Sequence, residues 1–360
     1  MTPPFVSGST WMTQNFHQIG SRPFWNLAVP GAHDAGTSVF TIPTFGSNAC
    51  NTQTQSKDIF GQLQSGVRYF DFRPVTWPDL GDFYHGHFAA VEGFFLGAAG
   101  QSLSTTLEQL ARFVQQPGCE KEVVILKLSH FLNLTKPLIE GLKFGFPDIV
   151  SGGGFGDSNF TDLTNAILNA MGPGLLYTSS ADDISLNNAT PAEIVSGSGR
   201  IIVVFDMAGE QAGGFPLSQV NLSNGIFSYN DAGNGPANLV VYDNYANMQA
   251  VSAMEADQKT KFQAFTPGPG QSFLLSWTLT ETVAESIEAY INPANCISDL
   301  ARSANLELEY AMQGWVNEGI ISKSKIPAIV YTDFADDQGY ALQTALYLNG
   351  IASGAAGAAA

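Results

Sequence analysis

Short segments rich in β-branched and aromatic residues recur along the chain, and this recurrence constrains the fold more than any other feature. Several segments are apolar on both faces, which is typical of parallel strands buried inside a sheet. Helical patterns lie between some of them, at residues 103–115, 161–171, 280–291 and 297–308. The predicted strands are residues 25–29, 69–73, 83–85, 123–128, 201–206, 239–243, 273–277 and 328–333.

The alternation of strands and helices predicts an α/β fold with a parallel sheet, and eight strands predict its closure into a TIM (β/α)8 barrel. We expect an irregular barrel, because helices look short or absent after the second and fifth predicted strands. A chain of 360 residues with 44% hydrophobic residues can bury one large core. The prediction is one barrel domain over residues 1–351, followed by a flexible tail of small residues at 352–360.

Ionisable or hydroxyl side chains follow nearly every predicted strand. In a barrel the carboxyl ends of all strands meet at one mouth, so these groups would face one another although they are far apart in sequence. Caps and turns also use Asp and Ser, but they do not explain recurrence at nearly every strand. The residues concerned are His33, Asp34, Asp71, Arg73, His85, Ser129, His130, Asp206, Asp243 and Asp333.

Charge and cysteine content exclude several classes of protein. The formal net charge is −17, with only 15 Lys and Arg, so nucleic-acid binding and electrostatic adsorption to an anionic membrane are not expected. No apolar run reaches the roughly 18 residues of a transmembrane helix. The three cysteines form no CxxC pair, which excludes zinc-ribbon and thioredoxin-like sites. One disulfide with a spare thiol and three buried thiols remain equally open.

The strongest local signals lie after the first two predicted strands. Pro30, Gly31 and Gly36 surround His33 and Asp34, so a tight turn can direct both side chains to one site. Asp71 and Arg73 share a strand face by period two, and an inward-facing Arg at a barrel mouth needs an anion. Phosphate suits the planar guanidinium group.

Arg68 lies in the opposite register and is predicted to be structural. In the segment Tyr84-His85-Gly86-His87, only His85 shares the site if the predicted strand ends there, and His87 is then expected in a loop.

These motifs resemble phosphatidylinositol-specific phospholipase C, in particular its bacterial, metal-independent type. The segments PGAHDAGT, GVRYFDFR and YHG match three N-terminal motifs of that family in order and spacing. The similarity continues in VVYDNY, AYINP and AIVYTDF, so that it covers most of the chain. One such motif is weak evidence, whereas six in the same order are specific.

The resemblance implies the roles of the site residues. His33 is the general base for the inositol 2-hydroxyl, and Asp333 supports it. His85, coupled to Asp34, is the general acid for the departing diacylglycerol oxygen, and Arg73 holds the phosphate oxygens. The product implied is inositol 1,2-cyclic phosphate. The residues expected to shape the head-group pocket are Asp71, Lys127, Ser129, Asp243 and Tyr245.

No metal or other cofactor is expected. Calcium-dependent relatives have carboxylates where Arg73 and Ser129 stand, and a guanidinium would repel the ion and replace its charge. The bacterial enzymes also carry basic residues where this chain has Ser129 and Ser198, so head-group specificity stays open. Lys127 or Arg200 could substitute for them.

The expected partner is a phospholipid at a membrane interface, contacted transiently through the apolar stretches at residues 38–45 and 91–96. We expect a secreted or extracellular monomer, although the first residues lack a signal-peptide pattern. Two alternatives remain: a phosphodiesterase for another phospholipid or glycerophosphodiester head group, and a catalytically silent inositol-phosphate-binding barrel.

Overall fold

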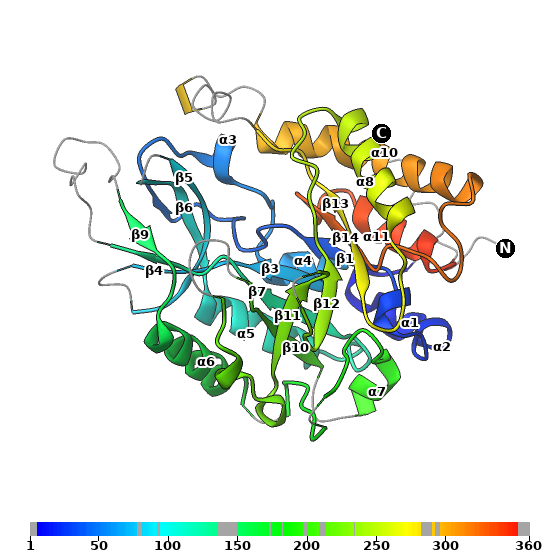
Figure 1. Cartoon of the computed structure of the whole chain (residues 1–360), viewed down its shortest axis with the longest axis horizontal. Helices are drawn as coiled ribbons and strands as arrows, with labels where there is room; N and C mark the ends of the chain where they lie inside the picture. Colours follow the sequence, from blue (N-terminus) through cyan, green and yellow to red (C-terminus); the bar gives the residue numbers. More distant parts are fainter. Residues whose placement is uncertain are drawn as a thin grey trace.

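Eight parallel strands close into a barrel in the computed structural model, which confirms the predicted α/β fold class (Figure 1). The hydrogen-bonded order around the barrel is β1-β14-β13-β12-β11-β10-β7-β3. Each barrel strand therefore pairs with the next barrel strand along the chain, and β14 pairs with β1 to close the barrel. The strands are β1 (Val29–Ala32), β3 (Tyr69–Phe72), β7 (Val124–Leu128), β10 (Ile201–Asp206), β11 (Ile226–Asp231), β12 (Leu239–Tyr242), β13 (Ser272–Trp277) and β14 (Ile329–Thr332).

The structure describes most of the chain but not all of it. The described residues are 6–77, 81–91, 94–135, 150–172, 174–181, 183–196, 200–208, 214–233, 235–281, 290–291 and 296–351. The predicted tail at 352–360 and Ser198 lie outside them. So does most of the helix predicted at 280–291.

Three strand predictions require correction. Residues Phe24–Asn26 form a 3-10 helix, so the first barrel strand begins only at Val29. The segment predicted at 83–85 belongs to a second sheet rather than to the barrel. The remaining barrel strand is Ile226–Asp231, which the prediction missed because Ser228 and Asn230 interrupt its apolar pattern. Both are buried, and the Ser228 hydroxyl donates to Asn238 Oδ1 at 2.9 Å.

Two strands of the second sheet follow almost directly after two barrel strands. Strand β4 (Pro74–Thr76) follows β3 after the single residue Arg73, and β8 (Leu132–Leu134) follows β7. In Figure 1 this sheet lies to one side of the barrel. Arg73 therefore stands at the junction of the two sheets. The order of strands is β2 (Ile42–Pro43), β6 (Phe94–Ser102), β5 (Tyr84–Val91), β4, β8 and β9 (Gly152–Gly153).

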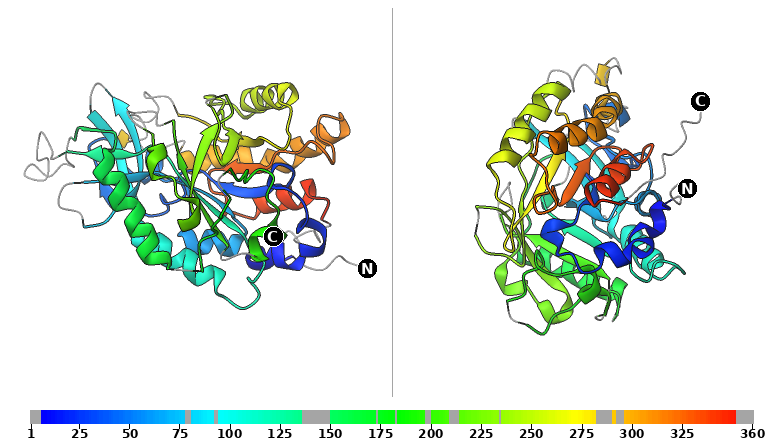
Figure 2. Two further views of the ribbon diagram at one scale, coloured as in Figure 1. Left: turned by 60° about the horizontal axis from the view of Figure 1, so that its bottom comes forward. Right: turned by 90° about the vertical axis from the view of Figure 1, so that its right-hand side faces the viewer.

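Helices pack around the outside of the barrel (Figure 2). The predictions near 103–115, 161–171 and 297–308 are confirmed as helices, the last one extending to Asn317. Between β10 and β11, the described residues hold only the 3-10 turns Leu217–Gln219 and Leu222–Asn224. The α-helices within the described residues are α1 (Trp11–Gln14), α2 (Phe16–Ile19), α3 (Ala49–Thr52), α4 (Ile59–Ser65), α5 (Leu103–Val114), α6 (Asp157–Met171), α7 (Pro191–Ser196), α8 (Val251–Ala264), α10 (Ile297–Asn317) and α11 (Tyr340–Leu348).

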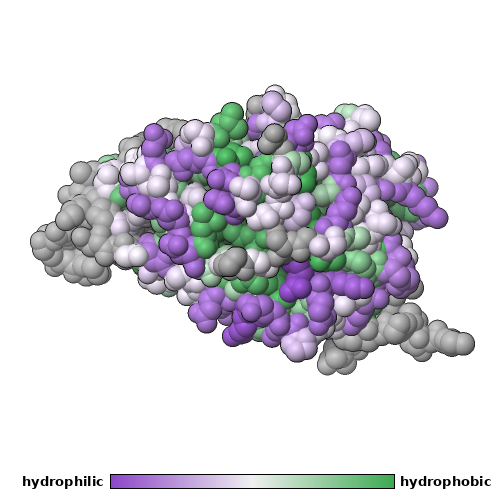
Figure 3. Space-filling model, turned by 90° about the horizontal axis from the view of Figure 1, so that it is seen from below, coloured by the Kyte–Doolittle hydropathy of each residue, from purple (hydrophilic) through white to green (hydrophobic). Residues whose placement is uncertain are grey.

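Alternate residues of the barrel strands build two cores. In β10, Val203 and Phe205 pack in a cluster with residues of α5 and α6, whereas Ile202 and Val204 belong to a second cluster with Tyr69. Burial on both faces explains the continuous apolar character of this strand. The face seen in Figure 3 mixes polar and apolar side chains. No helix in the described part of the chain has the length and hydropathy to cross a bilayer.

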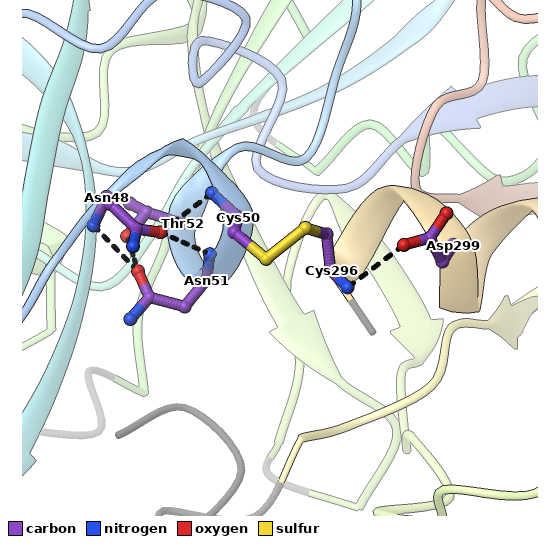
Figure 4. Close-up of a disulfide and its surroundings, with 6 residues drawn as sticks. All are labelled: Asn48, Cys50, Asn51, Thr52, Cys296 and Asp299. Atoms are coloured by element: carbon purple, nitrogen blue, oxygen red, sulfur yellow. Dashed lines mark hydrogen bonds between the residues drawn. A yellow bond between two sulfur atoms is a disulfide. The ribbon is translucent and has the colours of Figure 1, made fainter. Parts of the chain in front are cut away.

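The cysteine alternatives are resolved in favour of one disulfide and one thiol. Cys50 in α3 is bonded to Cys296 immediately before α10 (Figure 4), and Cys119 is a buried free thiol. The bridge joins residues 246 positions apart in sequence. It ties the segment after β1 to the segment after β13, both at the carboxyl end of the barrel.

Candidate active site

The turn after β1 brings His33 and Asp34 to the mouth of the barrel, as predicted. Asp34 adopts a positive φ of 43°, a conformation that Asp tolerates better than most residues. The backbone N–H of His33 donates to Thr332 of β14, and that of Ala35 donates to Asp71 of β3. Backbone bonds to both neighbouring strands therefore position this turn.

His33 has the surroundings of a general base. Its Nδ1 lies 2.7 Å from Asp333 Oδ1, and its Nε2 lies 2.9 Å from Arg73 Nη2. Because a guanidinium only donates, Nε2 is the acceptor and Nδ1 carries the proton toward Asp333. Burial lowers the pKa of His33, but the charges of Asp34 and Asp333 and the bond to Asp333 outweigh burial and raise it above its ordinary value. The side chain is one-fifth exposed.

Arg73 connects the carboxylates of the site to this histidine. Its Nε lies 2.7 Å from Asp34 Oδ1 and 3.1 Å from Asp71 Oδ2. Burial raises the pKa of Asp34, but Arg73, His33 and His87 outweigh burial and hold it well below its ordinary value. Both carboxylates are fully buried and charged, so they fix the guanidinium at the mouth, where it is 18% exposed.

Asp71 is buried beneath the exposed part of the site, where it contacts several other side chains. Tyr331 Oη donates to its Oδ2 at 2.6 Å and Ser129 Oγ donates to its Oδ1 at 3.0 Å. Lys127 Nζ lies 3.5 Å from the same carboxylate and 3.1 Å from Asp243 Oδ2. The predicted pocket residues Asp71, Lys127, Ser129 and Asp243 are thus brought together, but the first three are buried.

Three other sequence predictions have different outcomes. Tyr245, 55% exposed, lies in the loop after β12 and has no side-chain hydrogen bond to this cluster within the described residues. Asp206 accepts a hydrogen bond from the Ala208 N–H in its own turn. Arg68 is structural as predicted: it is buried and lies 2.7 Å from Glu122.

The histidines of β5 correct the prediction for this segment. The strand does not end at His85 but continues to Val91, so His87 is a strand residue instead of a loop residue. Both histidines face Asp34: His85 Nε2 is 3.4 Å from Oδ1, and His87 Nε2 is 3.6 Å from Oδ2. The missed signal was period two, which places residues i and i+2 on one face of a strand.

Sequence reasoning also missed the segment that supports the turns after β1 and β14. The Gln55 side chain donates to the His33 carbonyl at 2.7 Å and accepts from the Ala335 N–H at 3.0 Å. Thr54 Oγ1 donates to the Asp34 carbonyl at 2.8 Å. Hydrogen bonds from short polar residues to distant backbone leave no local pattern in the sequence.

One group of side chains in the described residues could in principle hold a cation. Donor atoms of His33, Asp34 and Asp71 lie within 4.8 Å of one another. The Arg73 guanidinium lies among them, in contact with both carboxylates. These residues fit a metal ion poorly, because it would have to displace a positive group from the same carboxylates.

Comparison with known proteins places this geometry in context. No family model matches the chain. A PI-PLC X domain-containing protein of Dictyostelium discoideum is 35% identical over 96 residues, which cover 23% of this chain and 17% of that protein. PI-PLC X domain-containing protein 3 of Mus musculus is 30% identical over 151 residues, which cover 35% and 43%. The chain spans less than half the length of these relatives.

Solved structures match nearly the whole chain. The phosphatidylinositol-specific phospholipase C of Listeria monocytogenes aligns with a TM-score of 0.54, covering 95% of this chain and 99% of that one at 18% identity. The S. aureus enzyme aligns with a TM-score of 0.57, covering 94% and 97% at 16% identity. The chain has the fold of phosphatidylinositol-specific phospholipase C. The resemblance predicted from the motifs is thus confirmed for the fold, and in sequence by the X domain-containing relatives.

Proposed function

We propose that this phospholipase C-like barrel cleaves the phosphodiester of phosphatidylinositol, or of glycosyl-phosphatidylinositol, to diacylglycerol and inositol 1,2-cyclic phosphate. The observation that carries the proposal is His33, oriented on one nitrogen by Asp333 and joined on the other to Arg73 at the exposed mouth. Internal attack needs a base, an acid and a positive group near phosphorus, and proximity supplies much of the remaining acceleration.

The chemical roles follow from the charges. In the free protein Arg73 Nη2 donates to His33 Nε2, so the guanidinium turns to the phosphate when substrate binds. The freed Nε2 then removes the proton of the inositol 2-hydroxyl as its oxygen attacks phosphorus. The bond from phosphorus to the diacylglycerol oxygen then breaks, and that oxygen takes a proton from a histidine beside Asp34, for which the resemblance nominates His85. Arg73 neutralises the phosphate oxygens. Each proton-transfer role is typically worth about a hundred- to ten-thousand-fold in rate.

The test is an assay on lipid vesicles of several head groups, with phosphorus NMR of the products. A cyclic phosphate released from phosphatidylinositol, but not in the His33→Ala variant, is the expected result. Unchanged turnover in His33→Ala would overturn the mechanism. Absence of turnover on every vesicle, together with inositol phosphate binding by calorimetry, would favour a silent binding barrel.

A second candidate function is cleavage of a different phospholipid or glycerophosphodiester head group. It is favoured by the contacts that already occupy Ser129 and Lys127, the residues at the expected inositol-binding positions. The Ser129 hydroxyl donates a hydrogen bond to Asp71, and Lys127 is buried between Asp71 and Asp243. Ser129 carries no charge and Lys127 is already paired with two carboxylates, so neither residue presents an unpaired positive charge to a sugar hydroxyl. Cleavage without a cyclic product would favour this candidate.

We also propose that the mouth contacts the membrane through apolar side chains, as a monomer acting at the interface. The segments after the carboxyl ends of the barrel strands carry most of the exposed large hydrophobic residues among the described residues, which suits shallow insertion despite the net charge of −17. The disulfide is consistent with a secreted protein. The exposed large hydrophobic residues of these segments are Val39, Phe45, Phe94, Leu217, Tyr245, Met248 and Ile291.

A further inference from the structure

The turns that carry His33 and Asp333 are joined by a third segment of the chain. Residues 54–56, which we call the bridging segment, lie between α3 and α4 and form hydrogen bonds to both turns. The disulfide between Cys50 and Cys296 anchors the residues just before it. The bridging segment is therefore placed to set the distance between the two turns.

Each residue of the bridging segment forms a hydrogen bond with the turn after β14. A backbone carbonyl, a side-chain amide and a side-chain hydroxyl take part, so the two segments run side by side. This turn begins with Asp333, whose carboxylate lies 2.7 Å from His33 Nδ1. The bonded pairs are the Thr54 carbonyl with the Phe334 N–H at 2.7 Å, Gln55 Oε1 with the Ala335 N–H at 3.0 Å, and Ser56 Oγ with the Asp336 carboxylate at 2.9 Å.

Gln55 bonds to both turns through one side chain. Its Nε2 donates to the His33 carbonyl at 2.7 Å, while its Oε1 accepts from Ala335. The same Nε2 lies 3.3 Å from the Thr332 carbonyl, which also accepts the His33 N–H. The side chain has no solvent exposure, so loss of the amide would leave buried backbone groups without these partners. Gln55 therefore holds the backbone of the base and the backbone beside its carboxylate partner in one arrangement.

We propose that Gln55 is a positioning residue that sets the contact between His33 and Asp333. Its effect on turnover rests on the proposed phosphodiester cleavage, but the contact itself can be observed without substrate. The direction of His33 Nε2 is defined by the bond of Nδ1 to Asp333 Oδ1. Gln55 acts on this bond through the backbone of the two turns. Misplacement of a reacting group by about 1 Å can cost about a hundredfold in rate.

The experiment compares Gln55→Met with Gln258→Met. Methionine keeps the length and the unbranched shape of the side chain but lacks the amide. Gln258 is the matched control, because it is also buried and its amide also bonds to the backbone of two separate segments. Its Nε2 donates to the Asn244 carbonyl at 2.9 Å, and its Oε1 accepts the Ser276 N–H at 3.1 Å. The two variants should lose similar stability, whereas only Gln55→Met should affect His33.

The first measurement needs no substrate. The proton on His33 Nδ1 is followed by NMR in protein with isotope-labelled histidine, and its signal is identified by its absence in His33→Ala. A short hydrogen bond to a carboxylate moves such a signal downfield. The signal should move upfield in Gln55→Met and keep the wild-type position in Gln258→Met. A signal that stays in place in folded Gln55→Met overturns the inference.

The second measurement is turnover of phosphatidylinositol in vesicles. The kcat of Gln55→Met should fall by about a hundredfold while KM stays within about threefold, because Gln55 orients the base and does not bind the substrate. A raised KM with an unchanged kcat contradicts the inference.

Folding of the variants is checked by circular dichroism, and Gln55→Asn provides a second test if Gln55→Met is unfolded. Asn keeps the amide but is one methylene shorter, so it cannot bond to both turns and should show the same changes. The wild-type protein separates the two proposals. Absence of a cyclic product from the wild type refutes the proposed function, while the NMR comparison still tests Gln55. A cyclic product from the wild type and an unchanged folded Gln55 variant refute only the role of Gln55.

Discussion

The two halves of the candidate site are built differently. His33, Arg73 and Asp333 stand at or next to the ends of parallel barrel strands, and the backbone N–H of His33 donates to the neighbouring strand β14. His85 and His87 lie within an antiparallel strand of the second sheet, paired with β6. A strand end offers one position to the mouth, whereas a continuing strand offers every second residue. Strand β5 therefore brings two histidines to Asp34, whereas the turn after β1 brings only His33 to it.

The largest expected effect comes from breaking the barrel half at Arg73. Arg73→Lys keeps the charge but cannot bridge Asp34, Asp71 and His33 with one planar group. We expect kcat to fall by about a hundred- to a thousand-fold on phosphatidylinositol vesicles, as for loss of a donor to developing charge. Arg112→Lys, on the outer surface over the Phe60 ring, is the matched control and should retain activity.

The next effect concerns the disulfide that holds α3, which contacts His87 of the second sheet. The double variant Cys50→Ser with Cys296→Ser releases α3, whose Thr52 carbonyl holds His87. We expect the free energy of unfolding to fall by about 2–4 kcal/mol in denaturant titrations without reductant. The control is Cys119→Ser at the free thiol. Equal stability of the double variant and the wild type would show that the bridge does not support the fold.

The close contact between the halves is tested at Gly36. A Cβ added there would lie 2.3 Å from the Cβ of His85, so one of the two segments must move. Gly36→Ala should cost about 1–3 kcal/mol in unfolding free energy and reduce turnover. Gly270→Ala, where an added Cβ meets open space, is the matched control. Wild-type stability in Gly36→Ala would contradict the packing described for the turn.

A smaller effect concerns the pKa of His33, the proposed general base. The pKa of His33 is raised above its ordinary value, partly by Asp333, and the base must be unprotonated. Activity should therefore decline as the pH falls through that raised pKa. Asp333→Asn removes a charge that raises it, so the acidic limb of kcat/KM should move to lower pH. A limb that stays in place in this variant would assign it to another group.

No effect is expected from removal of metal ions. The Arg73 guanidinium lies between the two carboxylates that a cation would need. Activity on vesicles should be the same in excess EDTA and in added calcium. Loss of activity in EDTA that calcium restores would mean that the guanidinium is displaced when the protein acts, and would change the description of the barrel half.

Much of the barrel half could be predicted from the sequence because its signals are local. The turn motif around His33, the period-two pair of Asp71 and Arg73, and the Asp after the last strand each occupy a few consecutive residues. Parallel closure then brings strand ends together without further information. Burial of Ser129 and Lys127 was not foreseen, because it depends on Asp71 and Tyr331 from other strands.

The sequence alone determined the barrel class, the position of its mouth and the identity of the residues there, since strand patterns and turn residues act over short distances. Only the tertiary structure decided that β5 leaves the barrel and continues through His87, that Gly36 covers His85, and that Cys50 joins Cys296. Each of these depends on pairing between segments far apart in the chain. A local pattern is compatible with several such pairings, and packing selects one.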